Sequence, residues 1–196
     1  PADFVKPGEV VINCAPKLGV FNIGRFPRGV DAVAEDICKA LDGAGFAGFP
    51  DADVMPGKYG KLLMNLSNVL DAAAGEAARK STLADRVRSE AETALKAAGI
   101  EYTMGFRHDD LMQMTPVPGV KRTGSSSAQS LARGVGSIET DYLNGEIVLI
   151  GRLHGVPVSA NEFLCELGRR LVGEGIAPGS LSIEDLQSAC EEPPAA

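Results

Sequence analysis

The chain has 196 residues, 44% of them hydrophobic, which is enough for one domain with an apolar core or slightly more. Its formal charge of −7 argues against a nucleic acid or an anionic membrane surface as a partner. The four cysteines form no Cys-x-x-Cys pair and have no histidine at metal-ligand spacing, so we expect reduced thiols, a cytoplasmic location and no metal site. No apolar run reaches the roughly 18 residues that a membrane-spanning helix needs.

The first 55 residues mix strand-like and helix-like patterns. Two β-rich runs at 8–14 and 18–26 are joined by a short connection and predict a β-hairpin. Apolar residues at helical spacing over 30–42 predict an amphipathic helix, and an extended piece follows at 49–54. We therefore expect 1–55 to form a small α/β region.

Residues 43–48 read GAGFAG and match the GxGxxG pattern of dinucleotide-binding loops. That use of the pattern requires a strand before the glycines and a helix N-terminus after them. Here a predicted helix comes first. We therefore expect Gly43 and Gly45 to end that helix and to form a turn.

From residue 56 onward the sequence predicts helices almost throughout. The change near residue 55 predicts a domain boundary, with a helical domain over 56–190 and a frayed tail at 191–196. Gly145 lies inside one helical pattern and predicts that another backbone packs closely against it. The predicted helices span 57–78, 82–97, 108–114, 124–132, 137–154, 159–172 and 182–190.

Residues 58–69, KYGKLLMNLSNV, carry three polar side chains within an otherwise apolar helical pattern. Lys61, Asn65 and Asn68 are spaced i, i+4 and i+7, so one continuous helix would present all three on one face. Such residues are most often solvated at a surface. Burying an unpaired amide costs about 1–3 kcal/mol, so the alternative interpretation is a helix that lines a polar cavity.

Two further stretches carry candidate site residues. The serines 125–127 stand at a predicted helix start, where one serine is explained as an N-cap and the others could help to hold a carboxylate. Glu139 and Asp141 stand in the first turn of the predicted helix 137–154, where acidic residues are common.

Together these stretches resemble the C-terminal domain of the ketopantoate reductases, or 2-dehydropantoate 2-reductases. That family carries a Lys-x-x-x-Asn helix, a Ser-Ser-Met-x-Gln-Asp stretch, a Thr-Glu-Ile-Asp-x-[Leu/Ile]-Asn-Gly stretch and a His-Gly pair, in this order. The counterparts here are Lys61 with Asn65, residues 126–130, residues 138–145 and His154-Gly155. The chain departs from the pattern at 128–130, which read Ala-Gln-Ser.

The resemblance implies a mainly α fold. It implies a helical C-terminal domain of the 6-phosphogluconate dehydrogenase C-terminal-like type, preceded by a short α/β remnant of a Rossmann-type domain. It also implies an NADP-dependent oxidoreductase that reduces 2-dehydropantoate to (R)-pantoate on the route to pantothenate and coenzyme A.

The resemblance also assigns roles to individual residues. Lys61 is expected to be the general acid, Asn65 to bind the substrate, and Ser127 to bind its carboxylate. Glu139 is expected to orient the substrate or the nicotinamide ribose and to hold the lysine.

The family often has a second asparagine where this chain has Val69, and Asn68 lies one residue earlier. We expect Asn68 to bind the substrate because it shares the predicted polar face with Lys61 and Asn65.

A GxGxxG loop after an N-terminal strand is not found in this sequence. We therefore expect a C-terminal part of a longer reductase, with NADP(H) bound mainly by an N-terminal domain and with the 196 residues inactive alone. One alternative is a divergent dehydrogenase acting on another 2-oxo acid. The other is a non-catalytic helical module that dimerises through 137–154, and a homodimer is left open in either case.

Overall fold

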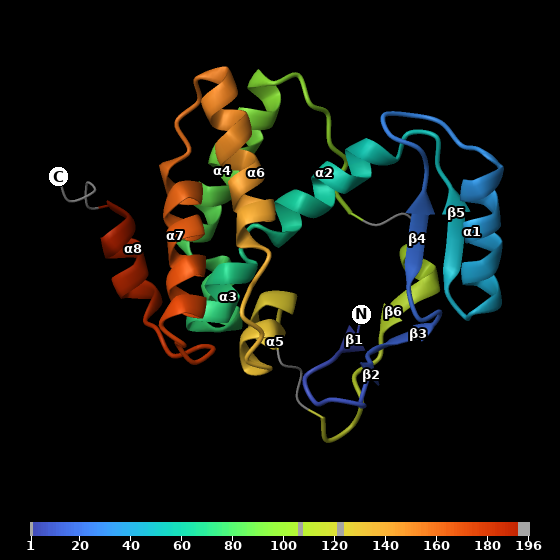
Figure 1. Ribbon diagram of the computed structural model, residues 1–196, viewed down its shortest axis with the longest axis horizontal. Helices are drawn as coiled ribbons and strands as arrows, with labels where there is room; N and C mark the ends of the chain where they lie inside the picture. The colour runs from blue at the N-terminus through green and yellow to red at the C-terminus, as the bar shows by residue number, and fades with distance from the viewer. Residues whose placement is uncertain (1, 106–107, 121–123, 192–196) are drawn as a thin grey trace. The chain divides into compact units, whose positions relative to one another are not determined.

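The computed structural model describes residues 2–105, 108–120 and 124–191, and Figure 1 shows that helices dominate, as predicted. The chain divides into two compact units. The first combines Pro1–Lys61 with Tyr102–Arg122, and the second combines Leu62–Glu101 with Thr123–Ala196. This division differs from a single boundary near residue 55, because the later segment 102–122 belongs with the first unit. Residues 192–196 of the expected tail lie outside the described residues.

The first unit contains short strands and one flanking helix. Strands β4 and β5 run parallel, and α1 connects them, which is the crossover that a parallel pair requires. Figure 1 shows α1 packed along this pair. The other two pairs, β1 with β2 and β3 with β6, are antiparallel. The elements are β1 (Ala2–Asp3), β2 (Val11–Ile12), β3 (Cys14–Pro16), β4 (Val20–Ile23), α1 (Ala32–Gly43), β5 (Ala47–Pro50), η2 (Asp109–Leu111) and β6 (Met112–Met114).

Two predictions for this unit were wrong. The runs 8–14 and 18–26 do not form a hairpin, because β3 pairs with β6 and β4 pairs with β5. For the same reason 108–114 is not an α-helix, since its second half is the strand β6. In both cases a partner that is distant in the sequence overrides the local pattern.

The prediction for GAGFAG is confirmed. Helix α1 ends at Gly43, and Gly45 has a φ of +87° in the turn that leads into β5. Because no helix follows these glycines directly, the arrangement lacks the helix N-terminus that cradles a pyrophosphate.

Helix α2 (Val54–Asn65) is closely approached by the segment that follows residue 101. A Cβ added to Gly60 would lie 1.8 Å from the carbonyl oxygen of Thr103, and the Thr103 N–H donates to the carbonyl of Pro56 over 3.0 Å. Glycine at position 60 is therefore required by this contact.

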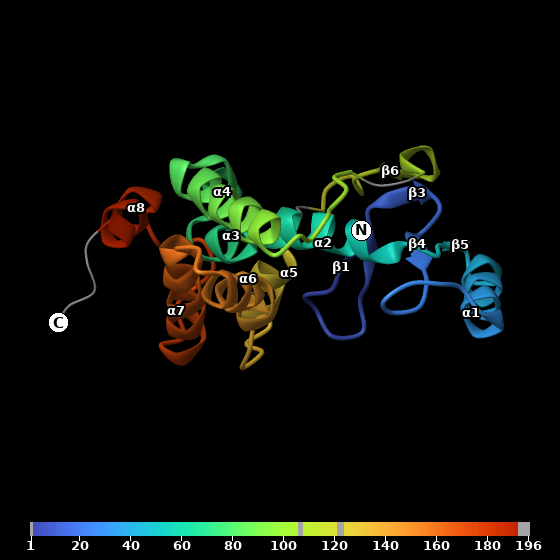
Figure 2. The same cartoon turned by 90° about the horizontal axis from the view of Figure 1, so that it is seen from above.

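The second unit is a helical bundle. In both views α6 and α7 lie side by side, with α8 next to α7, and α4 packs against both α6 and α7 (Figures 1 and 2). Its helices are α3 (Asn68–Ala74), η1 (Glu76–Lys80), α4 (Thr82–Ala97), α5 (Ser126–Ala132), α6 (Thr140–His154), α7 (Ser159–Gly173) and α8 (Ile183–Glu191). None of the helices within the described ranges is both long and apolar enough to span a membrane.

The predicted helix 57–78 is broken, which corrects the sequence interpretation. Helix α2 ends at Asn65, a turn covers Leu66 and Ser67, and α3 starts at Asn68. Asn68 therefore does not continue the face of α2 that carries Lys61 and Asn65.

The close approach expected at Gly145 is found elsewhere. A Cβ on Gly145 would have no backbone or side-chain atom nearer than 3.8 Å. A Cβ on Gly168 would lie 2.9 Å from the Cβ of Thr140, so α6 and α7 are in direct contact at Gly168. The spacing of apolar residues around Gly145 predicts a helix, but it does not show whether Gly145 or Gly168 lies at the contact between α6 and α7.

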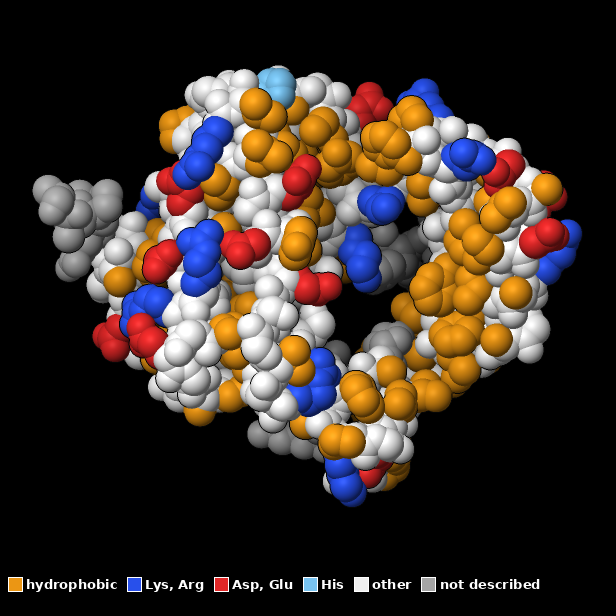
Figure 3. All heavy atoms as spheres, viewed as in Figure 1, with side chains coloured by type: hydrophobic (Ala, Val, Ile, Leu, Met, Phe, Trp, Pro, Cys, Tyr) orange, Lys and Arg blue, Asp and Glu red, His pale blue; other side chains and the backbone are white. Residues whose placement is uncertain are grey.

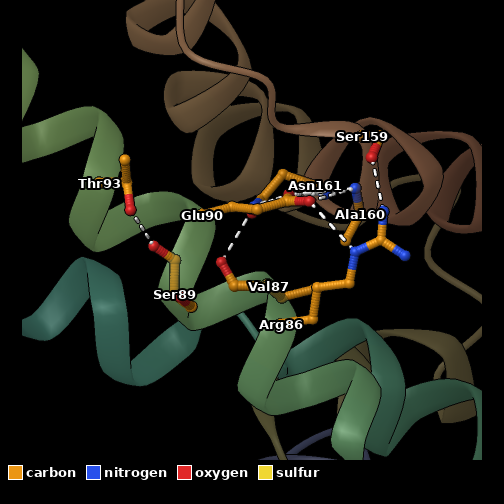
Figure 4. Close-up of polar contacts among 8 residues, drawn as sticks. All are labelled: Arg86, Val87, Ser89, Glu90, Thr93, Ser159, Ala160 and Asn161. Atoms are coloured by element: carbon orange, nitrogen blue, oxygen red, sulfur yellow. Dashed lines mark hydrogen bonds and ion pairs between the residues drawn. The ribbon is translucent and has the colours of Figure 1, made fainter.

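A carboxylate on α4 caps the start of α7 (Figure 4). Glu90 accepts hydrogen bonds from the backbone N–H groups of Ala160 and Asn161, at 3.0 and 3.2 Å, and from Nδ2 of Asn161 at 3.1 Å. Beside it, Arg86 donates to Ser159 over 2.7 Å. These bonds satisfy N–H groups that a helix start leaves without an intrahelical acceptor.

Candidate functional site

Lys61 and Asn65 lie on the same helix, one turn apart. Lys61 is exposed, and Asn65 is half-buried at the last position of α2. The division into units falls between Lys61 and Leu62, so Lys61 belongs to the first unit. The other predicted site residues, Asn65, Asn68, Ser127 and Glu139, belong to the second.

Asn68 is buried at the start of α3. Its Oδ1 accepts a hydrogen bond of 3.0 Å from the Arg79 guanidinium. Its backbone carbonyl accepts one of 3.1 Å from the Ser125 hydroxyl. Asn68 is therefore held by η1 on one side and by the start of α5 on the other.

The start of α5 is built on a buried carboxylate. Asp71 of α3 accepts the backbone N–H of Ser125 over 2.5 Å, and the Ser125 hydroxyl accepts the N–H of Ala128 over 3.3 Å. Ser125 is thus the N-cap of α5, as expected for one of the three serines. Ser127 is buried in the first turn. The structure therefore brings the start of α5, which carries Ser127, against Asn68 and Asp71 of α3.

Glu139 is exposed at the N-cap position of α6, beside a hollow of about 390 Å³. Next to Ser130 in its wall, Arg133 donates to the Ser130 hydroxyl over 3.1 Å. A carboxylate, several hydroxyls and an amide around one opening can bind a ligand that carries hydroxyl groups. The lining residues are Ser126, Gln129, Ser130, Arg133, Val135, Ser137, Ile138, Glu139 and Tyr142.

Asn144 and Asn161 form a buried polar pair that the sequence interpretation did not assign. Nδ2 of Asn144 donates to the carbonyl of Leu66 over 3.2 Å and to Oδ1 of Asn161 over 3.1 Å. Nδ2 of Asn161 in turn donates to the carbonyl of Val87 over 3.0 Å. Asn144 lies in the stretch that carries the family resemblance, but helical periodicity does not distinguish a buried asparagine from a solvated one.

A second, smaller hollow of about 260 Å³ lies between the start of α6 and α7. Burial raises the pKa of the Cys165 thiol in its wall to about 11. The thiol is therefore protonated at neutral pH and is a poor nucleophile. Among the described residues, no group of three or more His, Cys, Asp or Glu side chains is placed to hold a metal ion.

The sequence of the chain matches a model of one protein family. The family description is Ketopantoate reductase PanE/ApbA C terminal, and the match covers residues 53–171. This range includes Lys61, Asn65, Ser127 and Glu139. No curated protein matches the chain in sequence.

The solved structures that resemble the fold include the following three. A PanE/ApbA family ketopantoate reductase from Ralstonia eutropha JMP134 has a TM-score of 0.62 and 24% identity, over 89% of this chain and 57% of that one. A 2-dehydropantoate 2-reductase from Methylococcus capsulatus has a TM-score of 0.62 and 18% identity, over 83% and 56% of the two chains. D-mandelate dehydrogenase, solved as a ternary structure with NADH and anilino(oxo)acetate, has a TM-score of 0.51 and 19% identity, over 86% and 68%.

The chain spans little more than half the length of the first two of these proteins, 57% and 56%. At these sequence identities the likeness shows a shared fold. The activity and substrate of each protein are therefore not carried over from the structural match.

Proposed function

Because the chain belongs to the ketopantoate reductase PanE/ApbA family, we propose that its whole gene product is an NADP-dependent 2-oxo acid reductase. The proposed reaction reduces 2-dehydropantoate to (R)-pantoate, for pantothenate and coenzyme A synthesis. The observation that carries this proposal is the family match over 53–171, which includes the proposed acid and all four proposed substrate or cofactor ligands.

The proposed chemistry divides between cofactor and protein. When bound, NADPH would supply the hydride for the carbonyl carbon of the substrate. Lys61 donates a proton from its Nζ to the carbonyl oxygen, which becomes the hydroxyl group of the product. The Asn65 and Asn68 amides and the Ser127 hydroxyl bind and orient the 2-oxo acid, so that less entropy is lost at the reaction step.

The residues around Glu139 fit a nucleotide ribose. The Glu139 carboxylate accepts hydrogen bonds only, and ribose hydroxyls are donors of the matching kind. The hollow of about 390 Å³ beside it is in the size range of small-ligand sites, and Ser126 and Ser137 add hydroxyls to its wall. In the proposal Glu139 and the hollow beside it contact only the ribose, and most other contacts with NADP(H) come from a dinucleotide-binding domain.

The test uses the whole gene product and follows NADPH oxidation with 2-dehydropantoate. Lys61→Ala should lower kcat by about 10²–10⁴-fold, which is the usual loss for a positioned acid. Lys58→Ala, which removes an exposed lysine one turn earlier on α2, is the matched control and should leave kcat unchanged. Equal effects of the two substitutions would reject Lys61 as the acid.

Measuring kcat/KM of the same enzyme with a panel of other 2-oxo acids distinguishes a 2-dehydropantoate reductase from the alternative, a divergent dehydrogenase. The highest kcat/KM with a different 2-oxo acid would keep the reductase proposal and replace its substrate. The 196-residue chain alone should neither oxidise NADPH nor bind it at micromolar concentration, and tight binding in a fluorescence titration would contradict the assignment of the cofactor site.

A second candidate function, dimerisation through α6, is favoured by one exposed apolar face. Tyr142, Leu149 and Leu153 are 83%, 52% and 71% exposed, and they share one side of α6. Figure 3 shows hydrophobic side chains at the surface over this helix. We propose a second copy of the chain as the occupant, because an antiparallel pair of α6 helices is complementary in charge.

The two ends of α6 carry side chains of opposite charge. Asp141 stands in its first turn and Arg152 in its last, so an antiparallel partner would place each acid opposite a base. Within the chain Asp141 also pairs with Arg169 over 3.2 Å and Arg152 with Glu162 over 2.8 Å, so the partner's charges would join these two ion pairs. Sedimentation should show a concentration-dependent dimer that Leu149→Glu and Leu153→Glu convert to a monomer. Exposed Val33 on α1 gives the control, Val33→Glu, and a monomeric wild type would refute this interface.

A further inference from the structure

The junction between α2 and α3 is held by an arginine that follows it in the chain. The Arg79 guanidinium donates to the carbonyl oxygen of Met64 over 3.2 Å and to Oδ1 of Asn68 over 3.0 Å. One planar side chain therefore ties the last turn of α2 to the first residue of α3. Asn65 lies directly after Met64, within the clamped segment.

A second side chain holds the same junction from α6. Nδ2 of the buried Asn144 donates to the carbonyl oxygen of Leu66, in the turn between the helices. Asn144 is itself fixed by Oδ1 of Asn161 over 3.1 Å. The carbonyls on both sides of Asn65, those of Met64 and Leu66, are thus each bound by a side chain from outside the junction.

The local sequence does not account for the break. Residues 64–69 read Met-Asn-Leu-Ser-Asn-Val and contain neither glycine nor proline, the usual causes of a helix interruption. In an uninterrupted helix the carbonyls of Met64 and Leu66 would accept N–H groups four residues later. Where that ladder stops, Arg79 and Asn144 supply donors instead. The break is therefore imposed by tertiary hydrogen bonds.

We propose that Arg79 and Asn144 are positioning residues that set the direction of the Asn65 and Asn68 amides toward the substrate. This inference rests on the proposed function, in which those amides bind the 2-oxo acid. Arginine suits the role because its guanidinium presents several donors in a rigid plane and can hold two acceptors at once. A lysine at position 79 could hold only one of the two in the same geometry.

The experiment measures KM and kcat for 2-dehydropantoate with the whole gene product. Arg79→Met should raise KM by about tenfold to a hundredfold, since a small misplacement of a binding group has effects of this size. Arg79→Lys should lie between Arg79→Met and the wild type. Arg88→Met is the matched control, because it also removes a guanidinium, one that pairs with Glu92 on the same helix α4.

A double-mutant cycle distinguishes positioning from general stabilisation. If Arg79 acts through Asn65, then Arg79→Met should raise KM far less in an Asn65→Ala background than in the wild type. Asn144→Ala should behave in the same way. Changes in KM that simply multiply would overturn the proposal, as would an unchanged KM in Arg79→Met or, if that variant does not fold, in Arg79→Lys.

Hydrogen exchange of the amides at 64–70 provides a readout that does not depend on the substrate. Faster exchange confined to this segment in Arg79→Lys supports the clamp, and exchange like that of the wild type overturns it. A wild-type protein that reduces none of the 2-oxo acids would refute the proposed function. The exchange measurement would still decide whether the clamp exists.

Discussion

The two compact units differ in how they bury their side chains. Among the residues that the structure describes, the large side chains that are fully buried belong, with the exception of Asn13, to the second unit, where they include Leu66, Ile147 and Leu164. The first unit leaves large apolar residues such as Phe21 and Val33 exposed. The second unit therefore has a core of its own, while the first has short strands and little enclosed apolar volume.

The strongest test of this comparison truncates one large apolar residue in each unit. Leu164→Ala should destabilise the second unit by about 2–5 kcal/mol, because a buried leucine is replaced by a cavity. Val33→Ala, at an exposed position of α1, should change stability by less than about 0.5 kcal/mol. Hydrogen exchange resolved by peptide measures each unit separately, and similar losses in both would contradict the contrast.

The next test concerns buried polar groups. Asn161→Leu should destabilise the second unit by about 1–3 kcal/mol for each group left without its partner, because Glu90 and Asn144 both lose a hydrogen bond. Asn22→Leu, at a half-buried strand position of the first unit, is the comparison. Urea denaturation measures the free energy of unfolding of both variants. A smaller loss in Asn161→Leu than in Asn22→Leu would contradict the expectation.

The sequence predicted the helical character of the second unit well, because apolar residues there recur at helical spacing. It did not predict the break at Leu66 and Ser67, since the side chains that cause it, Arg79 and Asn144, are remote from the junction. The pairing of β3 with β6 was not predicted either, because these two strands are also remote from one another in the sequence. Among the candidate residues, the burial of Asn68 against Arg79 could not be predicted from the sequence, because η1 follows no periodic pattern of apolar residues.

Two glycine substitutions give a contrast of opposite sign. Gly168→Ala should destabilise the second unit by about 1–3 kcal/mol, because the added methyl group would overlap Thr140. Gly43→Ala should stabilise the first unit by up to about 1 kcal/mol, since no atom lies within 4 Å of the new Cβ and the unfolded chain loses freedom. Thermal denaturation measures the Tm of both variants. A lower Tm for Gly43→Ala as well would contradict the prediction and show that position 43 does not tolerate a side chain.

The smallest expected effect is a pH dependence in the second unit. Burial raises the pKa of Cys165 from 9.0 to about 11, so its contribution to stability is complete below about pH 9 and is lost as the pH rises through about 11. Cys165→Ala should therefore lose less stability than the wild type between these pH values. Parallel denaturation curves for the two proteins across this range would remove the thiol as a cause.

The hydrogen bond between Asn144 and Leu66 also bears on the order of folding. Its partners are 78 residues apart, so the turn between α2 and α3 gains its amide donor only after α6 has docked. Local helices form much faster than such distant contacts. We expect Asn144→Ala to accelerate unfolding while leaving the refolding rate nearly unchanged, which corresponds to a φ-value near zero in stopped-flow kinetics. The segment assigned to substrate binding would then be among the last parts of the second unit to reach its native conformation.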